Sequence, residues 1–424
     1  MTRVLAIPVY RRLLVAYTLN ELAWSIGTVA LAVLVYRRTG SAIGATAFFI
    51  CAQTIPALIS PLVVARIDQR PARRVLPVLY GIEAIAFASL AWVTARFALA
   101  PALVLALVDG VAAVSARAIA RATTVAVLTP RGLLREGNAL MNGSFSVCFM
   151  AGPAIGGLVV ALGGTQAALI ANSAMFAAIA LTMLTTAGLP PAPHEPAPSA
   201  GRLRRAFEHA RQTPAIRILL GLQAVALLFF TMSVPVEVVF TSNTLHAGAG
   251  GYGALLSAWG AGAVVGSLIY ARWREVPSRT LIAGGAGALG IGLLGMAVSP
   301  ALGYAIAAAA IAGAGNGVEA VSVRTALQEA VDPRWMTLMM SFSESMAEAV
   351  PGFGILLGGA VATLASPRAA LATAGAGGLV VTGLIAYKLR PDRLLAGPAA
   401  SDGPLEPGES SGSMRSEQPS EAIR

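Results

Sequence analysis

The chain has 424 residues, of which 56% are hydrophobic and only 12% are charged, with a net charge of +10 and a mean hydropathy of +0.73. A soluble domain carries about 25% charged residues, so this chain has too little polar surface to cover a water-soluble fold. The positive charge does not indicate nucleic-acid binding, because the basic residues are spread between apolar blocks and gather on no single tail or face.

Apolar blocks run through the chain, beginning with Leu13–Tyr36, which contains one acidic residue and no basic one. A helix needs about 20 mostly apolar residues to cross about 30 Å of hydrocarbon, and helices satisfy their own backbone groups where lipid offers no partner. We therefore predict an all-α membrane protein with twelve transmembrane helices in two pseudo-symmetric six-helix bundles. The helices are expected at residues 11–36, 42–66, 74–96, 99–125, 136–162, 165–188, 216–244, 250–272, 278–299, 301–327, 336–364 and 367–389.

One long polar segment divides these helices six and six. Residues 190–215 are rich first in Pro and then in Arg, and form the predicted cytoplasmic linker, with a short helix on the membrane surface near 202–211. The linker separates an N-terminal six-helix bundle, 1–189, from a C-terminal one, 216–390. Residues 391–424 are rich in Gly, Pro, Ser and Glu, and are expected to form a disordered cytoplasmic tail.

The placement of Lys and Arg predicts the orientation. If the N-terminus is cytoplasmic, 26 of the 30 Lys and Arg residues fall on the inner side. The outer side then receives Arg37, Arg38, Arg96 and Arg368. Because such a bias in short loops sets the orientation of membrane proteins, we predict a multi-pass protein of the cell (inner) membrane with both termini cytoplasmic.

The two halves of the chain look like copies of each other. Residues 65–73 and 271–279 share Ala, Arg, Pro and Arg at a constant offset of 206. Residues 121–131 and 324–334 share Arg, Pro and Arg at an offset of 203. Both matches fall at equivalent positions of the two predicted bundles. Repeated six-helix halves are typical of transporters that rock around a central site.

Glycine motifs mark three of the predicted helices. Gly143 is followed nine residues later by Gly152-Pro153-Ala154-Ile155-Gly156-Gly157, and Gly-rich segments recur at Gly260–Gly266 and Gly313–Gly317. Small residues three or four apart let helix backbones approach closely, and a Gly-Pro pair bends a helix. Tight helix packing without a mechanistic role is the alternative interpretation.

The loop Arg66–Arg74 combines Asp68 with several Arg residues between the second and third predicted helices. With the glycine motifs, it resembles the major facilitator superfamily over about residues 8–390, and more closely the bacterial drug-exporter-like branch. The resemblance implies a gating role for Asp68, Arg73 and Arg74, and an antiporter role for the glycine motif of the fifth helix. The loop departs from the family pattern because its leading Gly is absent and the spacing to Arg73 is altered.

Polar residues inside apolar helices are the candidate functional residues. A charge at the centre of the membrane costs at least about 2.5–3.5 kcal/mol, so such groups should face the bundle interior, pair, or hold a proton. A buried carboxyl that water reaches alternately from each side can carry a proton across. The candidates for proton coupling or the substrate cavity are Asn20, Glu21, Asp109, Arg117, Glu237, Glu319, Glu344 and Glu348.

Structural roles are the alternatives for the charged candidates. Asp109 and Arg117 are eight residues apart on one helix face, so an ion pair between them would let both insert. Glu237 follows Pro235 near the outer end of its helix, which favours a position on the rim.

Glu344 and Glu348 are one turn apart on the eleventh predicted helix. They either share a proton, or one of them approaches Arg324 or Arg334.

The sequence contains no spacing typical of a catalytic triad, a phosphate loop or a metal site, and His194, His209 and His246 look like isolated surface residues. We therefore expect no enzyme, cofactor or metal. We expect a secondary active transporter that exports small amphipathic compounds by proton-coupled alternating access, as a monomer in the lipid bilayer. The alternatives are an uptake permease for a small nutrient on the same scaffold, a membrane enzyme such as a lipid-linked glycosyl transferase, and a non-transporting sensor.

Overall fold

The computed structural model describes residues 2–39, 50–94, 98–190, 201–273 and 275–388, and every regular element in these ranges is a helix. Before residue 190 the elements are α1 (Thr2–Leu5), α2 (Pro8–Thr39), the π-helix η1 (Ile50–Thr54), α4 (Ile55–Ile67), α5 (Ala72–Val93), α6 (Leu99–Leu128), the 3-10 turn η3 (Thr129–Arg131) and α7 (Leu134–Leu184). After it they are α8 (Arg202–Gln212), α9 (Pro214–Val239), the π-helix η4 (Phe240–Thr244), α10 (Gly248–Arg272), α11 (Ser278–Val298), α12 (Leu302–Ala330), the 3-10 turn η5 (Pro333–Trp335), α13 (Met336–Leu364) and α14 (Pro367–Lys388).

Ten stretches of the described residues are long and apolar enough to cross a membrane. The long α2 and the first part of α7 bring the number of membrane-length helices to twelve. Within the 51 residues of α7, Gly164 has φ 75° and ψ 173° and breaks the helix, at the boundary expected between residues 162 and 165. A residue with positive φ here favours Gly, which has no Cβ.

Several helix ends differ by a few residues from those expected. The first membrane helix begins at Pro8, three residues earlier than predicted, because Pro is well suited to the first turn of a helix. The expected start at residue 42 and the expected end at residue 96 lie outside the described residues.

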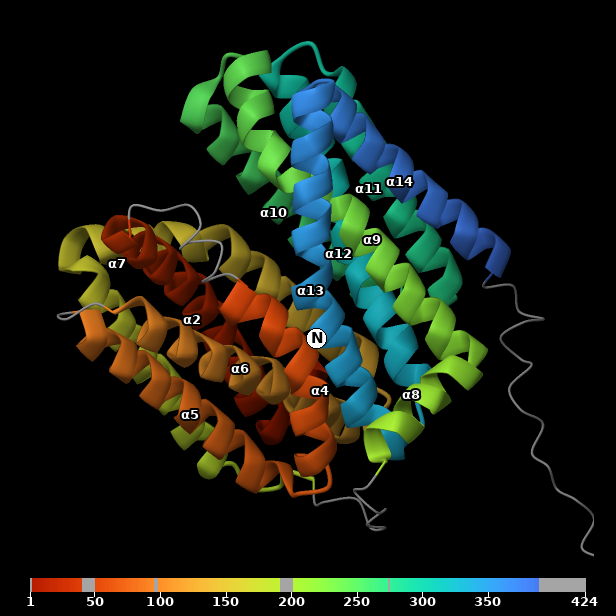
Figure 1. Ribbon diagram of the computed structural model, residues 1–424. Helices are drawn as coiled ribbons and strands as arrows, with labels where there is room; N and C mark the ends of the chain where they lie inside the picture. Colours follow the sequence, from red (N-terminus) through yellow and green to blue (C-terminus); the bar gives the residue numbers. More distant parts are fainter. Residues whose placement is uncertain (1, 40–49, 95–97, 191–200, 274, 389–424) are drawn as a thin grey trace, which may run out of the picture.

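The helices form two groups, coloured red to yellow and green to blue in Figure 1. In the first group α7 packs on α2 and α5, and α6 packs on α4 and α5. In the second, α12 packs on α10 and α11, while α14 packs on α11 and α9. The groups meet where α13 crosses α4 and α6, and where α10 lies along α7. The expected all-α fold with two six-helix bundles is thereby confirmed.

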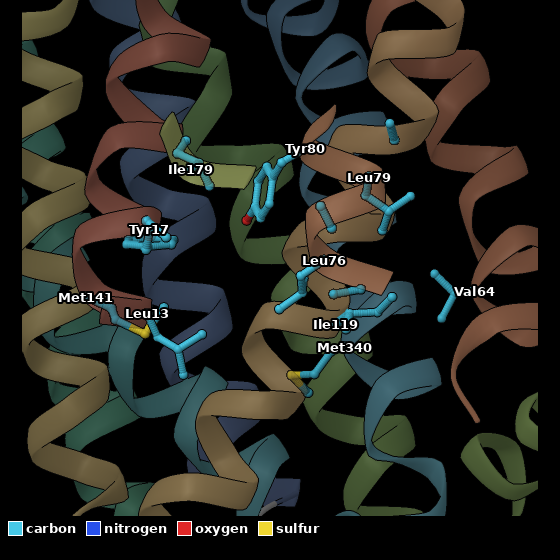
Figure 2. Close-up of a cluster of buried hydrophobic side chains, with 14 of the residues drawn as sticks. Leu13, Tyr17, Val64, Leu76, Leu79, Tyr80, Ile119, Met141, Ile179 and Met340 are labelled. Atoms are coloured by element: carbon cyan, nitrogen blue, oxygen red, sulfur yellow. The ribbon is translucent and has the colours of Figure 1, made fainter. Parts of the chain in front are cut away.

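The largest apolar core lies in the first group and extends across the junction. Figure 2 shows Leu13 and Tyr17 of α2, Leu76 of α5 and Ile119 of α6 with Met340 of α13 in one buried cluster. These side chains are at most 6% exposed. Because Met340 belongs to the second group, apolar packing as well as polar contact joins the two.

Glycines allow the helices of the second group to pack closely. A Cβ on Gly313 would lie 1.9 Å from the carbonyl oxygen of Trp259, and one on Gly262 would lie 2.1 Å from that of Ala310. Gly266 and Gly317 are equally close to backbone across the same contact. Such approach is possible only without a side chain, so α10 and α12 pack backbone to backbone.

The short helix α8 lies across the junction. It packs on α9, α13 and α4 through a face that includes the buried Arg202, Ala206 and Ala210. Gly201 starts it in the left-handed region, with φ 71°. The expected linker helix is therefore present, and it contacts both groups. We call the end of the molecule where α4 ends, α5 begins and α8 lies the α8 side.

Gly313→Ala should destabilise the protein, because the added methyl group overpacks a contact that has no space, at a cost of about 1–3 kcal/mol. Thermal unfolding of the purified protein in detergent measures this as a lower Tm. Gly303→Ala on the same helix is the matched control, because a Cβ there meets nothing within 4 Å. An unchanged Tm for Gly313→Ala would show that α10 and α12 do not pack as described.

Candidate functional site

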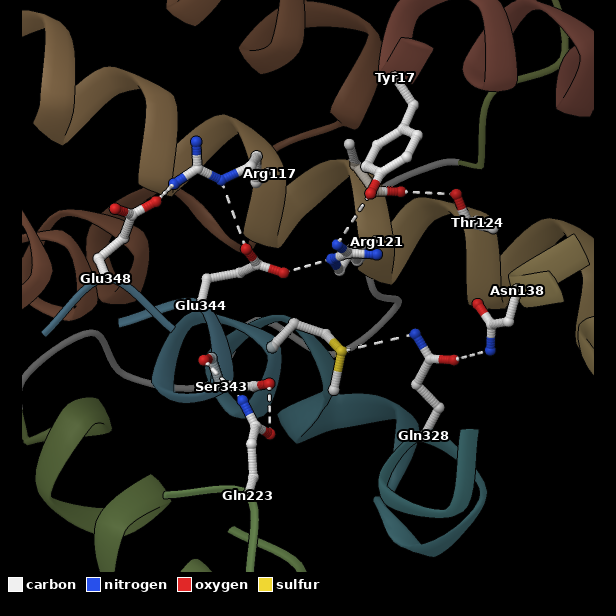
Figure 3. A network of polar contacts seen from close by, with 12 residues as sticks. Tyr17, Arg117, Arg121, Thr124, Asn138, Gln223, Gln328, Ser343, Glu344 and Glu348 are labelled. Carbon is white, nitrogen blue, oxygen red and sulfur yellow. Dashed lines mark hydrogen bonds and ion pairs between the residues drawn. The ribbon is translucent and has the colours of Figure 1, made fainter. Parts of the chain in front are cut away.

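Two arginines and two glutamates form a network between the two groups of helices. Arg117 and Arg121 lie one turn apart on α6, and Glu344 and Glu348 lie one turn apart on α13. Arg117 donates to Glu348, and its Nε lies 3.3 Å from Oε2 of Glu344, while Nε of Arg121 donates to Oε1 of Glu344. Figure 3 shows Glu344 between the two guanidinium groups.

This network is buried within the membrane-spanning part. The four side chains are between 6% and 14% exposed. Glu344 is eight residues into α13, about 12 Å by helical rise, and Arg117 is 11 residues from the end of α6, about 17 Å. Removing one partner of a buried ion pair costs about 3–5 kcal/mol, because the other charge stays buried and unpaired. The network therefore stabilises the contact between α6 and α13.

A third helix contributes to the same site. The guanidinium of Arg121 lies 5.2 Å from the ring centre of Tyr17 on α2, and its Nη2 donates to the Tyr17 hydroxyl at 3.4 Å. Glu21 is buried one turn further along α2, within electrostatic reach of Arg117 and Arg121. A cation over an aromatic face is attracted by the ring quadrupole, so Tyr17 helps to hold Arg121 in place.

A second polar layer lies closer to the α8 side. Arg135 of α7 forms an ion pair with Glu329 of α12, with Nε and Oε1 2.9 Å apart. Nδ2 of Asn138 donates to Thr325 at 2.9 Å and to Gln328 at 2.6 Å.

The polar contacts described between the two groups end at an aromatic layer. Asn142 of α7 donates to Ser267 of α10 at 2.8 Å, and further from the α8 side the ring of Phe149 lies 5.6 Å from that of Trp259. Phe230 stacks on Trp259 at 5.6 Å. Phe149 is 15 residues into α7, about 22 Å from its start. In the described residues, the two groups are thus held together from the α8 side to beyond the network.

Asp68 of the predicted gating loop pairs with α8. Arg202 donates from both Nε and Nη2 to the Asp68 carboxylate, with Nη2 and Oδ2 2.6 Å apart. Its Nη2 also donates to the carbonyl of Arg334 at 2.9 Å, and its guanidinium lies 5.1 Å from the ring centre of Trp335. Burial raises the pKa of Asp68, and the hydrogen bonds and charge of Arg202 oppose that rise. Arg202 therefore connects α4 with the start of α13.

The other members of the predicted gating loop, Arg73 and Arg74, are not buried as Asp68 is. Both side chains are exposed in the first turn of α5. His209, expected on the surface, is only partly exposed and stacks on Trp335 with ring centres 5.8 Å apart. Burial lowers the pKa of His209.

The remaining candidates lie apart from the network. Asn20 and Asp109 line a cavity of about 40 Å³ inside the first group of helices, which reaches Arg117 and Glu348 at one end. Glu237 is buried two residues before the end of α9, with Oε1 accepting a hydrogen bond of 2.9 Å from Ser233. Glu319 is buried on α12, where its backbone packs against Gly285 of α11.

The glycine motif of the fifth predicted helix lies in the first part of α7. A Cβ on Gly152 would lie 2.4 Å from Oγ of Ser25, so this glycine lets α7 approach α2. Gly156 is buried, whereas a Cβ on Gly143 or Gly157 would meet nothing within 4 Å. Pro153 lies in α7, and its side chain is outside the described part.

Sequence reasoning found Arg117, Glu344 and Glu348 but not how they pair. An ion pair between Asp109 and Arg117 was the structural alternative, and Arg121 and Tyr17 were not selected. The available signal was the match between two Arg residues four apart on one apolar helix and two Glu residues four apart on another. Residues four apart share a helix face, so the two pairs can meet in parallel.

Comparison with known proteins agrees with this architecture. The family model described as transmembrane secretion effector, one of the major facilitator superfamily models, matches residues 3–403. The chain therefore belongs to this family of transporters within the major facilitator superfamily. No curated protein matches the chain in sequence.

Solved structures of the same superfamily share the fold. The fucose:proton symporter of E. coli is 13% identical, with a TM-score of 0.69 over 90% of this chain and 98% of that one. The human organic anion transporter MFSD10 is 18% identical, with a TM-score of 0.71 over 89% and 98%. A bacterial homologue of the iron transporter ferroportin, in an outward-facing state, is 11% identical, with a TM-score of 0.74 over 90% and 100%. At these identities the likeness concerns the fold alone.

A double-mutant cycle on Arg121 and Glu344 tests the network. Each of Arg121→Gln and Glu344→Gln should destabilise the protein by about 3–5 kcal/mol, and the double variant by much less than their sum, because no unpaired charge remains. Unfolding in detergent, followed by tryptophan fluorescence, provides the free energies. Arg204→Gln with Glu208→Gln, an exposed pair four residues apart on α8, is the control cycle and should couple weakly. Additive losses at Arg121 and Glu344 would contradict the pairing.

Proposed function

We propose that this protein exports small amphipathic compounds across the cell (inner) membrane in exchange for protons, by alternating access. The observation that carries the proposal is the network of Arg117 and Arg121 with Glu344 and Glu348. It is a buried connection between the two groups of helices, and its strength depends on carboxylate charge. In a family of transporters, a charge-dependent connection between bundles is a suitable place for ion coupling.

A proton and an arginine compete for the same carboxylate in this site. When Glu344 is ionised, it accepts from Arg121 and lies beside Arg117, which keeps the α8 side closed. Protonation would remove the charge that both guanidinium groups face and would weaken the closed state. A ligand shifts a two-state equilibrium by its differential affinity for the two states, so proton binding would favour opening of the α8 side. Glu21 is a further carboxyl that could accept a proton, because it lies within electrostatic reach of Arg117 and Arg121.

The aromatic layer next to the network suggests the substrate class. Phe149, Phe230 and Trp259 lie close together where the polar contacts between the groups end. Aromatic faces attract cations and bind flat apolar rings. We propose that amphipathic compounds bind on this layer, between the two bundles of one chain, so that a monomer suffices.

Charge placement supports the assignment of the α8 side to the cytoplasm. The loops on that side carry most of the arginines, and positive residues in short loops are retained inside. With this orientation, both termini are cytoplasmic, and the closed α8 side corresponds to a cytoplasmic gate. Asp68 and Arg202 would form part of that gate, with residues 190–215 as the linker between the bundles.

Proteoliposomes test the coupling. Addition of a transported compound should release protons, as reported by a pH-sensitive dye, and Glu344→Gln should reduce this release about 5–150-fold, the range of a coupling energy of 1–3 kcal/mol. Glu208→Gln on the exposed face of α8 removes the same charge outside the network and should leave the release unchanged. Transport of several amphipathic cations without any proton release would count against proton exchange.

Cysteine labelling tests the orientation. In a background in which Cys51 and Cys148 are replaced by Ala, a membrane-impermeant maleimide added to whole cells should label Ala365→Cys, at the loop between α13 and α14. It should not label Arg204→Cys on α8 until the cells are permeabilised. Both positions are exposed, so accessibility within the protein does not separate them. Labelling of Arg204→Cys alone in intact cells would reverse the orientation.

A further inference from the structure

Two carboxylates inside the first group of helices have unsatisfied oxygens. Glu83 on α5 is 0% exposed, and neither of its carboxylate oxygens has a hydrogen-bond partner among the described residues. The buried Oδ1 of Asp109 on α6 likewise has no hydrogen-bond partner among the described residues. An unpaired buried polar group costs about 1–3 kcal/mol, and more when it is charged. These two acids therefore need a proton, water or a bound cation to satisfy their oxygens.

Both carboxylates line the cavity that reaches Arg117. Its volume of about 40 Å³ is enough for about three water molecules, because one needs about 10–15 Å³. Sites for drug-sized ligands are much larger, about 300–1,000 Å³. The cavity is thus too small for an amphipathic substrate but large enough for a small hydrated ion.

Further oxygen atoms surround the two acids. Asn20 of α2 and Gln53 of η1 line the same cavity. The carbonyl oxygen of Ala52, also in η1, lies 2.4 Å from the position that a Cβ on Gly110 would take, so the glycine makes room for it. Backbone carbonyls of irregular membrane helices are known ligands of sodium, and π-helical turns occur frequently at functional sites.

An unsatisfied amide lies behind this cavity. Asn172 of α7 is completely buried, and neither its Oδ1 nor its Nδ2 has a hydrogen-bond partner among the described residues. A Cβ on the cavity-lining Gly27 would lie 2.5 Å from that Nδ2. Asn172 is thus a further unsatisfied polar group, next to a glycine that lines the cavity.

The charge balance of the cavity favours a cation. Arg117, the positive residue among those lining it, already contacts Glu344 and Glu348. Among the described residues no group of three or more His, Cys, Asp or Glu could hold a metal ion, so the donor set does not fit a transition metal. Carboxylate, carbonyl and water ligands suit hard cations. One ionised carboxylate beside one that keeps its proton balances a single positive charge.

From these observations we propose that Glu83 and Asp109 bind a small monovalent metal cation, for which Na⁺ is the test ion, with the carbonyl of Ala52 and the side chains of Gln53 and Asn20 as supporting ligands. The proposed ligands all lie in the first group of helices, and the proposal does not rest on proton exchange at the network. It gives the first group of helices an ion-dependent conformation.

Ion-dependent unfolding of the full-length protein in detergent tests the proposal. At fixed pH and ionic strength, replacing choline chloride by NaCl should raise Tm by several degrees, because a ligand that binds only the folded state stabilises it. The fluorescence of Trp24, which lines the cavity, should change over the same concentration range, and Trp24→Phe should remove that signal. Glu83→Gln and Asp109→Asn should each abolish the shift in Tm.

Control variants separate ion binding in this cavity from a general effect of salt on surface charge. Glu208→Gln, which removes an exposed negative charge, should keep the full response to Na⁺. If Glu83→Gln does not fold, Gly110→Ala tests the site independently, because its methyl group would displace the carbonyl of Ala52. Equal Tm values in NaCl and choline chloride would overturn the proposal. A response to methylammonium but not to Na⁺ would also overturn it, and would assign the cavity to the amine of an organic substrate.

Discussion

A charge inside a membrane needs a counter-charge or water, because lipid cannot solvate it. In this protein Arg117 and Arg121 of α6 meet that requirement through Glu344 and Glu348 of α13, across the junction of two helix groups. Neither helix could keep its charges buried if the groups separated without a change in protonation or hydration. The state of four side chains is therefore linked to the relative position of two bundles.

The contacts on the two sides of the network differ in kind. The layer that contains Arg135 and the contact between Asp68 and Arg202 lie on its α8 side, and the aromatic layer around Trp259 lies beyond it. The second group is packed backbone to backbone at Gly313, so it can move as a rigid unit. The first group instead contains a cavity lined by Glu83 and Asp109 beside the network, which makes it the more suitable half for ion binding.

Much of the fold followed from the sequence, because a membrane span needs a long apolar stretch and leaves a strong local signal. The break at Gly164 and the helix α8 were also expected where they occur. The partners within the site were predicted less well. Glu348 was expected near another carboxyl or near Arg324 or Arg334, and it instead contacts Arg117, 231 residues away in the chain. Asp109 shares a helix with Arg117 but does not pair with it.

The sequence by itself thus determined the all-α membrane fold and indicated most of the buried acidic residues. Long apolar stretches mark the spans, and acidic residues inside those stretches stand out. The tertiary structure alone decided which charges meet. Pairing depends on the rotation and depth of helices that are distant in sequence, and apolar packing sets both. The same packing left Glu83 and Asp109 without partners, beside a cavity that no pattern in the sequence marks.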